Sequence, residues 1–108
     1  MSAYEAAVHE LGLEPRGPEA RLSAHLAEQD TDLIARLVHL REAAGITRES
    51  LAQAWAVPVG VIEEFEAPGA DPRLSMVRHY AAAIGARYSH RVELDADVHP
   101  SHIKESER

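Results

Sequence analysis

Charged side chains between residues 48 and 78 are the candidates for binding another molecule. Arg48, Arg73 and Arg78 carry permanent positive charges, which suit contacts to phosphate groups. Glu63 and Glu64 are adjacent carboxylates, which could accept hydrogen bonds from the amino group of cytosine or form an acidic face that meets a protein. The arginines could equally be ordinary solvated surface residues, so both interpretations remain open.

Metal binding and catalysis have less support in the sequence. His99 and His102 could both contact one metal ion, but no third ligand is close to them in sequence, so we expect no metal and no cofactor. The chain has no cysteine, which excludes disulfides and thiolate metal sites. We find no Ser/His/Asp set and no phosphate-cradling glycine loop, and we therefore expect that the chain is not an enzyme.

The composition indicates what kind of fold must position these groups. A chain of 108 residues with 45% hydrophobic and 27% charged residues suits one globular domain. The net charge of −7 lowers the expectation of nucleic-acid binding, which depends largely on lysine and arginine. No apolar run approaches the roughly 20 residues of a membrane span, and residues 1–10 lack the basic residues of a signal peptide. We therefore expect a cytoplasmic protein that does not bind a membrane.

The spacing of apolar residues predicts an all-α fold, a compact bundle of four to five helices with short N-terminal helices before it and a C-terminal strand after it. Asp30 or Thr31 is the expected N-cap of one helix and Thr47 that of the next. Gly45 and Gly85 suit left-handed helix ends. The predicted helices cover residues 2–12, 19–29, 32–44, 48–55, 59–67 and 75–84.

The predicted strand is indicated by alternation of residue types over 87–94. Tyr88, His90, Val92 and Leu94 fall on one side, and polar residues fall on the other. A lone strand has no partner in this chain, so we expect that it could pair with its own copy across a dimer axis. The predicted organisation is an N-terminal helical arm at 1–31, a helical domain at 32–85, a C-terminal strand and candidate dimerisation element at 86–94, and a flexible polar tail at 95–108.

The stretch from Leu37 to Ala52 resembles the start of the XRE-type (Cro/phage-repressor-like) helix-turn-helix domain. That family has an arginine, three residues, a glycine, an apolar residue, Ser or Thr, and then a Leu-Ala pair on its second helix. The resemblance covers about half the chain and implies that the domain at 32–85 contains a helix-turn-helix formed by the helices at 48–55 and 59–67. The matching residues are Arg41, Gly45, Ile46, Thr47, Leu51, Ala52, Val57, Val61, Ile62, Phe65, Glu66 and the stretch 77–85.

The resemblance also implies roles for particular residues. Arg41 and Glu66 match a structural ion pair between the first and third helices of the domain. Arg48 matches a phosphate-contacting position at the start of the second helix, and Arg73 and Arg78 could extend that contact. The expected base-facing residues on the third helix are Val59, Gly60, Glu63 and Glu64.

Two functional hypotheses follow. The first is a dimeric DNA-binding transcriptional regulator, a repressor or an antitoxin-like protein, whose third core helix enters the major groove of double-stranded DNA. The second keeps the fold as a protein-interaction module that binds a basic partner such as a toxin, without specific DNA binding. The net charge of −7 and the absence of Arg, Gln or Asn at the base-facing positions motivate the second hypothesis. Ile34, Val38 and the helix at 19–29 could form a dimer face, or the N-terminal helices could cover their own domain.

Overall fold

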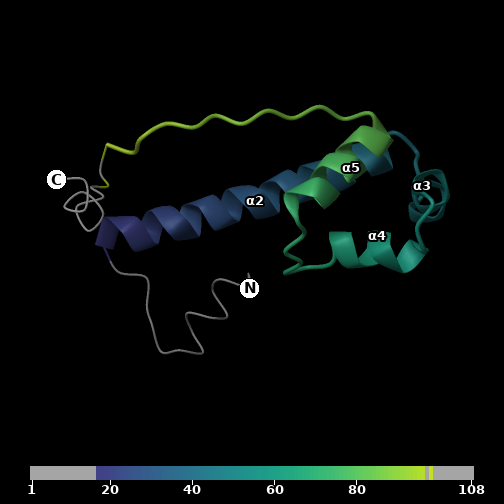
Figure 1. Cartoon of the computed structure of the whole chain (residues 1–108), viewed down its shortest axis with the longest axis horizontal. Coiled ribbons are helices and arrows are strands. Elements are labelled where there is room, and N and C mark those ends of the chain that lie inside the picture. The colour runs from purple at the N-terminus through teal and green to yellow at the C-terminus, as the bar shows by residue number, and fades with distance from the viewer. Residues whose placement is uncertain (1–16, 97, 99–108) are drawn as a thin grey trace.

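The amino-acid chain forms four helices over the residues that the computed structural model describes, which are 17–96 and 98. Figure 1 shows one long helix with three shorter helices gathered at its C-terminal end. The all-α class expected from the sequence is confirmed for these residues. The helix predicted at 2–12 and the histidine pair at 99 and 102 lie outside them. The helices are α2 (Gly17–Ala43), α3 (Arg48–Trp55), α4 (Val59–Glu66) and α5 (Leu74–Ile84).

Helix α2 is continuous across residues 29–32, where the sequence predicts a break between two helices, so that prediction is wrong. Asp30 and Thr31 are interior residues of α2, not N-caps. The hydroxyl of Thr31 donates to the carbonyl oxygen of Ala27 at 3.2 Å, and Asp32 pairs with Arg36 one turn later at 3.0 Å. Residues 19–43 contain no glycine and no proline, and polar capping residues alone do not end a helix that lacks them. The domain boundary predicted after residue 31 therefore falls inside one helix.

The hydrophobic core lies where α3, α4 and α5 pack against the C-terminal part of α2. The 27 residues of α2 make a helix about 40 Å long, and Leu37 and Arg41 are its buried residues. Its N-terminal half extends beyond the other helices (Figure 1). Within the core, the rings of Phe65 and Tyr80 stack with centroids 4.4 Å apart. The buried apolar residues are Leu37, Leu51, Ala52, Ile62, Phe65, Val77, Tyr80 and Ala81.

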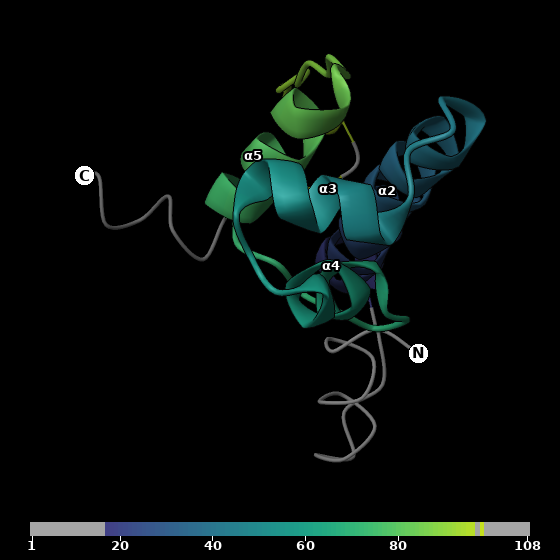
Figure 2. The ribbon, with the colours of Figure 1, turned by 90° about the vertical axis from the view of Figure 1, so that its right-hand side faces the viewer.

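Helices α3 and α4 are short and are held in place by local signals at their ends. The hydroxyl of Thr47 accepts a hydrogen bond from the backbone N–H of Ser50 at 3.0 Å, which confirms the predicted cap. Helix α3 ends at Ala56, which adopts a left-handed conformation with φ of 61°. The turn at 56–58 leads directly into α4, and the two helices pack against each other (Figure 2). Each has eight residues, too few to be stable without such packing.

The chain after α5 forms no strand in the described residues, so the predicted strand is not present in a single chain. Ala86 and Tyr88 pack against the core, and residues 89–96 are exposed. Figure 1 shows this segment running back along the length of α2 without regular structure. A strand needs a hydrogen-bonding neighbour, and the described chain offers none here. Among the described residues, no helix combines the length and the apolar character needed to cross a membrane.

Candidate nucleic-acid interface

Glu66, the last residue of α4, is the centre of a polar cluster that joins all four helices. Arg41 of α2 donates to it twice, from Nε to Oε2 at 2.8 Å and from Nη2 to Oε1 at 3.1 Å. Arg48 of α3 donates from Nε to Oε1 at 2.9 Å, and the Tyr80 hydroxyl of α5 donates to Oε2 at 2.5 Å. The Glu66 side chain is 2% exposed. The ion pair that the resemblance implies between Arg41 and Glu66 is therefore present, with two further partners.

The electrostatics of this cluster keep Glu66, Tyr80 and Arg41 in the protonation states that their hydrogen bonds require. Burial by itself would raise the pKa of Glu66, but the hydrogen bonds from Arg41, Tyr80 and Arg48 outweigh it and lower that pKa below its usual value. Burial and the hydrogen bond to Glu66 raise the pKa of Tyr80, which therefore stays protonated and can donate. Burial lowers the pKa of Arg41, but its hydrogen bonds to Glu66 and Tyr80 raise it overall.

Each buried side-chain nitrogen and oxygen atom of the cluster has a hydrogen-bond partner. Arg41 also donates from Nη1 to the carbonyl oxygen of Ile46 at 2.7 Å, which ties the α2–α3 connection to the cluster. The described residues contain no buried side-chain nitrogen or oxygen atom without a hydrogen bond. A satisfied polar network of this kind holds its helices in one arrangement. The cluster thus fixes α4 relative to α2 and α5.

Sequence reasoning missed two members of this cluster. It included Tyr80 within the matching stretch 77–85 and assigned Arg48 to phosphate contact. A buried tyrosine almost always needs a partner for its hydroxyl, so Tyr80 signalled a nearby polar group that the sequence could not identify. The hydrogen bond from Arg48 to Glu66 depends on the distance between the start of α3 and the end of α4, which is set by the packing of the helices.

Arg48 is anchored and exposed at the same time. Its side chain is 48% exposed although Nε is bonded to Glu66. Its hydrogen bond within the described part of the chain comes from Nε, and its terminal nitrogens Nη1 and Nη2 donate none there. The hydrogen bond to Glu66, and then the charges of Glu66 and Glu63, raise the pKa of Arg48 above its usual value. An arginine held in this way can offer its terminal nitrogens to a phosphate oxygen.

The outward face of α4 carries three of the four predicted base-facing residues. Gly60, Glu63 and Glu64 are exposed, whereas Val59 is partly buried and packs against the core. A methyl group added at Gly60 would meet no atom within 4 Å, so packing inside the chain does not require glycine there. Close approach of another molecule is a different reason for a glycine at an exposed helix position.

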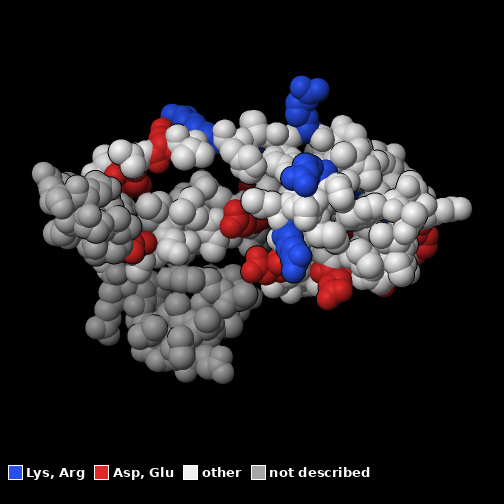
Figure 3. Space-filling view, viewed as in Figure 1, with Lys and Arg blue, Asp and Glu red and all other residues white. Residues whose placement is uncertain are grey.

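Arg73 and Arg78 lie on the α5 side of the molecule. Arg73 is the residue before α5 and makes no side-chain cap, and Arg78 lies within the helix. Both are exposed, and neither forms an ion pair within the described chain. The structure shows no contact among Arg48, Arg73 and Arg78. On the face in Figure 3, basic and acidic side chains are interleaved around α4 and α5, without a continuous basic patch.

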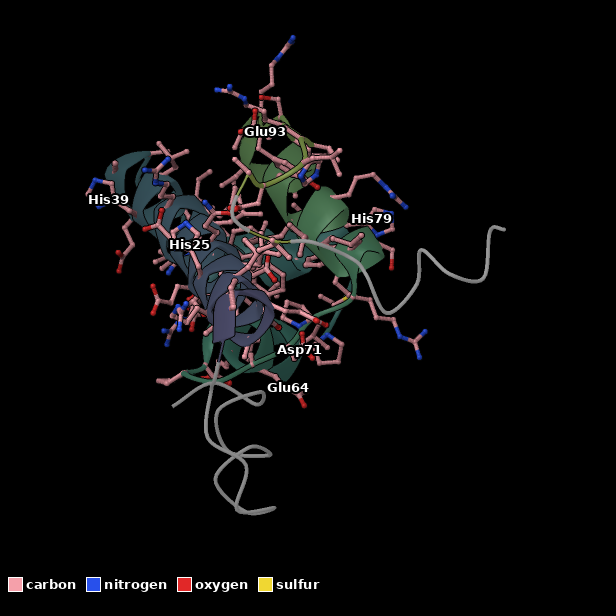
Figure 4. The ribbon with its side chains drawn as sticks, turned by 90° about the vertical axis from the view of Figure 1, so that its left-hand side faces the viewer. His25, His39, Glu64, Asp71, His79 and Glu93 are labelled. Atoms are coloured by element: carbon pink, nitrogen blue, oxygen red, sulfur yellow. The ribbon has the colours of Figure 1, made fainter. Side chains whose placement is uncertain are left out.

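A hollow beside α4 was not anticipated from the sequence. Its volume is about 240 Å³, and it opens between α4 and the loop that leads to α5. Glu64 and Asp71 are among the residues that line it, and Figure 4 shows the two residues on the same side of the molecule. Its size is slightly below the roughly 300 Å³ at which small-molecule pockets begin. The lining residues are Val61, Glu64, Phe65, Ala70, Asp71, Pro72 and Met76.

The histidines of the described chain provide no metal centre. His25, His39 and His79 lie apart from one another (Figure 4), and no group of three or more metal-binding side chains occurs within residues 17–96 and 98. His25 contacts Gln29 on α2 at 3.3 Å. The ring of His79 packs edge-on against Trp55 with centroids 6.0 Å apart, which gives it a structural role between α5 and α3.

Comparisons with protein-family models, with curated proteins and with solved structures gave no match for this chain.

Proposed function

We propose that this protein is a DNA-binding transcriptional regulator of the repressor or antitoxin-like kind, and that α3 and α4 form a helix-turn-helix of the XRE type it resembles. The observation that supports this most is the buried cluster around Glu66. It anchors the C-terminal end of α4 to α2, α3 and α5 while Gly60, Glu63 and Glu64 stay exposed. A rigidly held helix with an open outer face suits insertion into the major groove.

Phosphate contacts would come from Arg48 at the start of α3 and from Arg73 and Arg78 at and within α5. Arg48 has two terminal nitrogens available, and its anchoring to Glu66 reduces the conformational freedom that it would lose on binding. Arg73 and Arg78 are exposed and have no competing ion pair within the described residues. These contacts would offset the repulsion between the phosphates and the acidic residues of α4.

Base contacts would come from the outer face of α4. Glu63 and Glu64 can each accept a hydrogen bond from a cytosine amino group. Gly60 would let the helix backbone approach the groove closely, and the exposed part of Val59 would contact a thymine methyl group. As a homodimer, the protein would place two such helices about 34–36 Å apart on successive turns of DNA.

The test is fluorescence anisotropy of labelled DNA from upstream of the protein's own gene, with a shuffled sequence as the reference, over a series of salt concentrations. We expect preferential binding that weakens steeply with salt. Arg48→Ala should weaken binding to all sequences and should reduce the slope of log K against log salt by about 0.9, the value expected for one neutralised phosphate.

Arg36→Ala is the matched control, since it removes the same charge from the exposed Arg36–Asp32 pair on α2. If Arg48→Ala and Arg36→Ala change the affinity equally, Arg48 makes no specific phosphate contact. If the wild-type protein binds no DNA even at low salt, the proposed function is wrong.

The hollow beside α4 favours a second candidate function, in which the same fold binds a basic protein. Glu64 and Asp71 line the hollow together with apolar residues that include Phe65 and Met76. This combination suits the long side chain of a lysine or arginine. The probe is a labelled peptide of alternating lysine and leucine residues. In this case Asp71→Asn should weaken peptide binding and Arg48→Ala should not. Unchanged peptide affinity in Asp71→Asn would exclude the hollow as the binding site.

A further inference from the structure

The segment that follows Ala86 leaves the backbone of residues 87–94 unpaired in the described chain. Ala86 donates its N–H to Ala81 at 2.8 Å, and the next backbone hydrogen bond along the chain joins Val98 to Asp95 at 3.3 Å. Residues 87–94 form no backbone hydrogen bond to any described residue. Unpaired N–H and C=O groups along an extended segment are a template for pairing with another chain.

Beyond Tyr88, which packs against the core, the apolar side of this segment is uncovered. Val92 and Leu94 are each 94% exposed, the highest values among the large apolar residues described. They alternate with Arg91 and Glu93, which form an exposed ion pair at 3.2 Å. The pattern is that of a strand with one apolar and one charged face, but without a neighbour.

We infer that residues 90–94 pair antiparallel with the same residues of a second copy of this chain, with Val92 on the twofold axis. In this arrangement Val92 faces the partner's Val92, and His90 faces the partner's Leu94. Arg91 faces the partner's Glu93, and the twofold symmetry repeats that pair on the other side of the axis. The inference adds a dimer contact to the proposed function but does not depend on DNA.

Charge complementarity selects this register over its neighbours. In an antiparallel pair, residues directly opposite each other point to the same face of the two strands. Val92 and Leu94 therefore share one face with their copies only if the twofold axis passes through a residue. An axis between two residues would place apolar residues opposite charged ones. With the axis on Arg91, two arginines would face each other, and with the axis on Glu93, two glutamates would do so. Like charges directly opposite destabilise a strand pair, whereas opposite charges stabilise it.

A register centred on His90 has a steric disadvantage. It would place Arg87 opposite the partner's Glu93, but it would also draw Ala86 and Tyr88 into the paired strands. Both of those residues pack against the core of their own protomer. The axis at Val92 instead uses only residues 90–94, which are all exposed. Each Arg91 then has one carboxylate beside it on its own strand and one across from it.

Cysteine cross-linking tests the register directly, because the natural chain contains no cysteine. Residues that face each other across an antiparallel pair have Cα atoms about 4.5–5.5 Å apart, which lies in the range a disulfide bridges. We expect Val92→Cys to form a covalent dimer under mild oxidation, without DNA present. His90→Cys alone and Leu94→Cys alone should not, since each residue is about 13 Å along the strand from its own copy. A mixture of the two variants should cross-link.

A charge swap provides the second measurement. In the Val92→Cys background, Arg91→Glu would place two glutamates opposite each other and should abolish the covalent dimer. Adding Glu93→Arg restores opposite charges and should restore the dimer. Loss in the single variant with recovery in the double variant supports the register, because general damage to the segment would not be repaired by a second substitution.

Several results would overturn the inference. No Val92→Cys dimer above the level found in denaturant would exclude self-pairing, and equal cross-linking at positions 90, 92 and 94 would exclude this register. Failure of the charge swap to restore the dimer would also count against it. A cross-linked Val92→Cys dimer that binds no DNA would instead contradict the proposed function and leave the dimer contact intact.

Discussion

Replacing Glu66 by glutamine should reveal how strongly the buried cluster supports the fold. Glu66→Gln keeps the shape of the side chain but removes its negative charge. One of its two oxygens becomes an NH₂ group, a donor. At the Oε1 position it would face the donors of Arg41 and Arg48, and at the Oε2 position those of Arg41 and Tyr80. The variant therefore leaves the guanidinium of Arg41, whose side chain is 6% exposed, without a counter-charge in the interior.

The expected loss is large compared with the stability of a small domain. Removing one partner of a buried ion pair costs about 3–5 kcal/mol, and the whole free energy of unfolding of such domains is about 5–15 kcal/mol. Asp32→Asn is the matched control, since it removes a carboxylate from the exposed pair with Arg36 on α2. Exposed helix pairs of this type contribute about 0.3–0.5 kcal/mol.

The assay is urea unfolding followed by circular dichroism at pH 7 and at a series of lower pH values. Because the pKa of Glu66 is lowered on folding, its contribution to stability is complete above its unfolded pKa of about 4.3. That contribution is lost as the pH falls through the lower, folded value. We expect the wild-type protein to lose stability steeply in acid and Glu66→Gln to lose less over the same interval.

Two results would refute this reasoning. One is a loss in Glu66→Gln at pH 7 no larger than that of Asp32→Asn. The other is a parallel decrease in the free energy of unfolding of the wild type and of Glu66→Gln as the pH falls through the range where a carboxylate of lowered pKa is protonated. Either outcome would mean that the cluster is solvated in solution and does not fix α4 against α2.

Three further substitutions test the cluster and the role of Gly60. Tyr80→Phe keeps the ring stack on Phe65 but removes the hydroxyl that donates to Glu66. We expect urea unfolding to detect a loss of about 1.5–3 kcal/mol in the free energy of unfolding, and acid unfolding to begin at a higher pH. Unchanged midpoints in both experiments would show that this hydrogen bond contributes nothing to stability. Gly60→Ala should stabilise the fold by about 0.5–1 kcal/mol, because a methyl group there meets no atom, and should weaken DNA binding by blocking close approach. Gly85→Ala is the control for Gly60→Ala and should destabilise the fold, because Gly85 has a φ of 77°. A Gly60→Ala variant with undiminished DNA affinity would contradict the role given to Gly60.

Local sequence signals predicted the three short helices of the core. The predicted ranges 48–55, 59–67 and 75–84 agree with α3, α4 and α5 to within one residue at each end. Thr47 caps α3 through its own side chain, and Gly45 and Gly85 adopt the left-handed conformation expected of glycine at a helix end. These signals act between residues only a few positions apart, so they can be recognised without knowing the fold.

The continuity of α2 could not be predicted in the same way. Asp30 and Thr31 have the side chains of N-caps, and in isolation they would favour the start of a helix. The choice between a cap and an interior position depends on the residues before them. Those residues contain no helix breaker after Pro18, and the hydroxyl of Thr31 is satisfied by Ala27 within the helix. The competing interactions have similar energies, so a local pattern does not decide between them.

Residue types at a recognisable spacing are sufficient to predict the all-α class and the ends of the short helices. The Arg41–Glu66 pair was expected only from the resemblance to the XRE-type domain, and the structure contains it. Three other relationships become apparent only in the folded chain: Arg48 and Tyr80 share the carboxylate of Glu66, Glu64 and Asp71 border one hollow, and Val92 and Leu94 remain uncovered. Those relationships join residues of different structural elements or depend on the absence of a neighbour. They are set by how the helices pack around the core, which residue order alone does not specify.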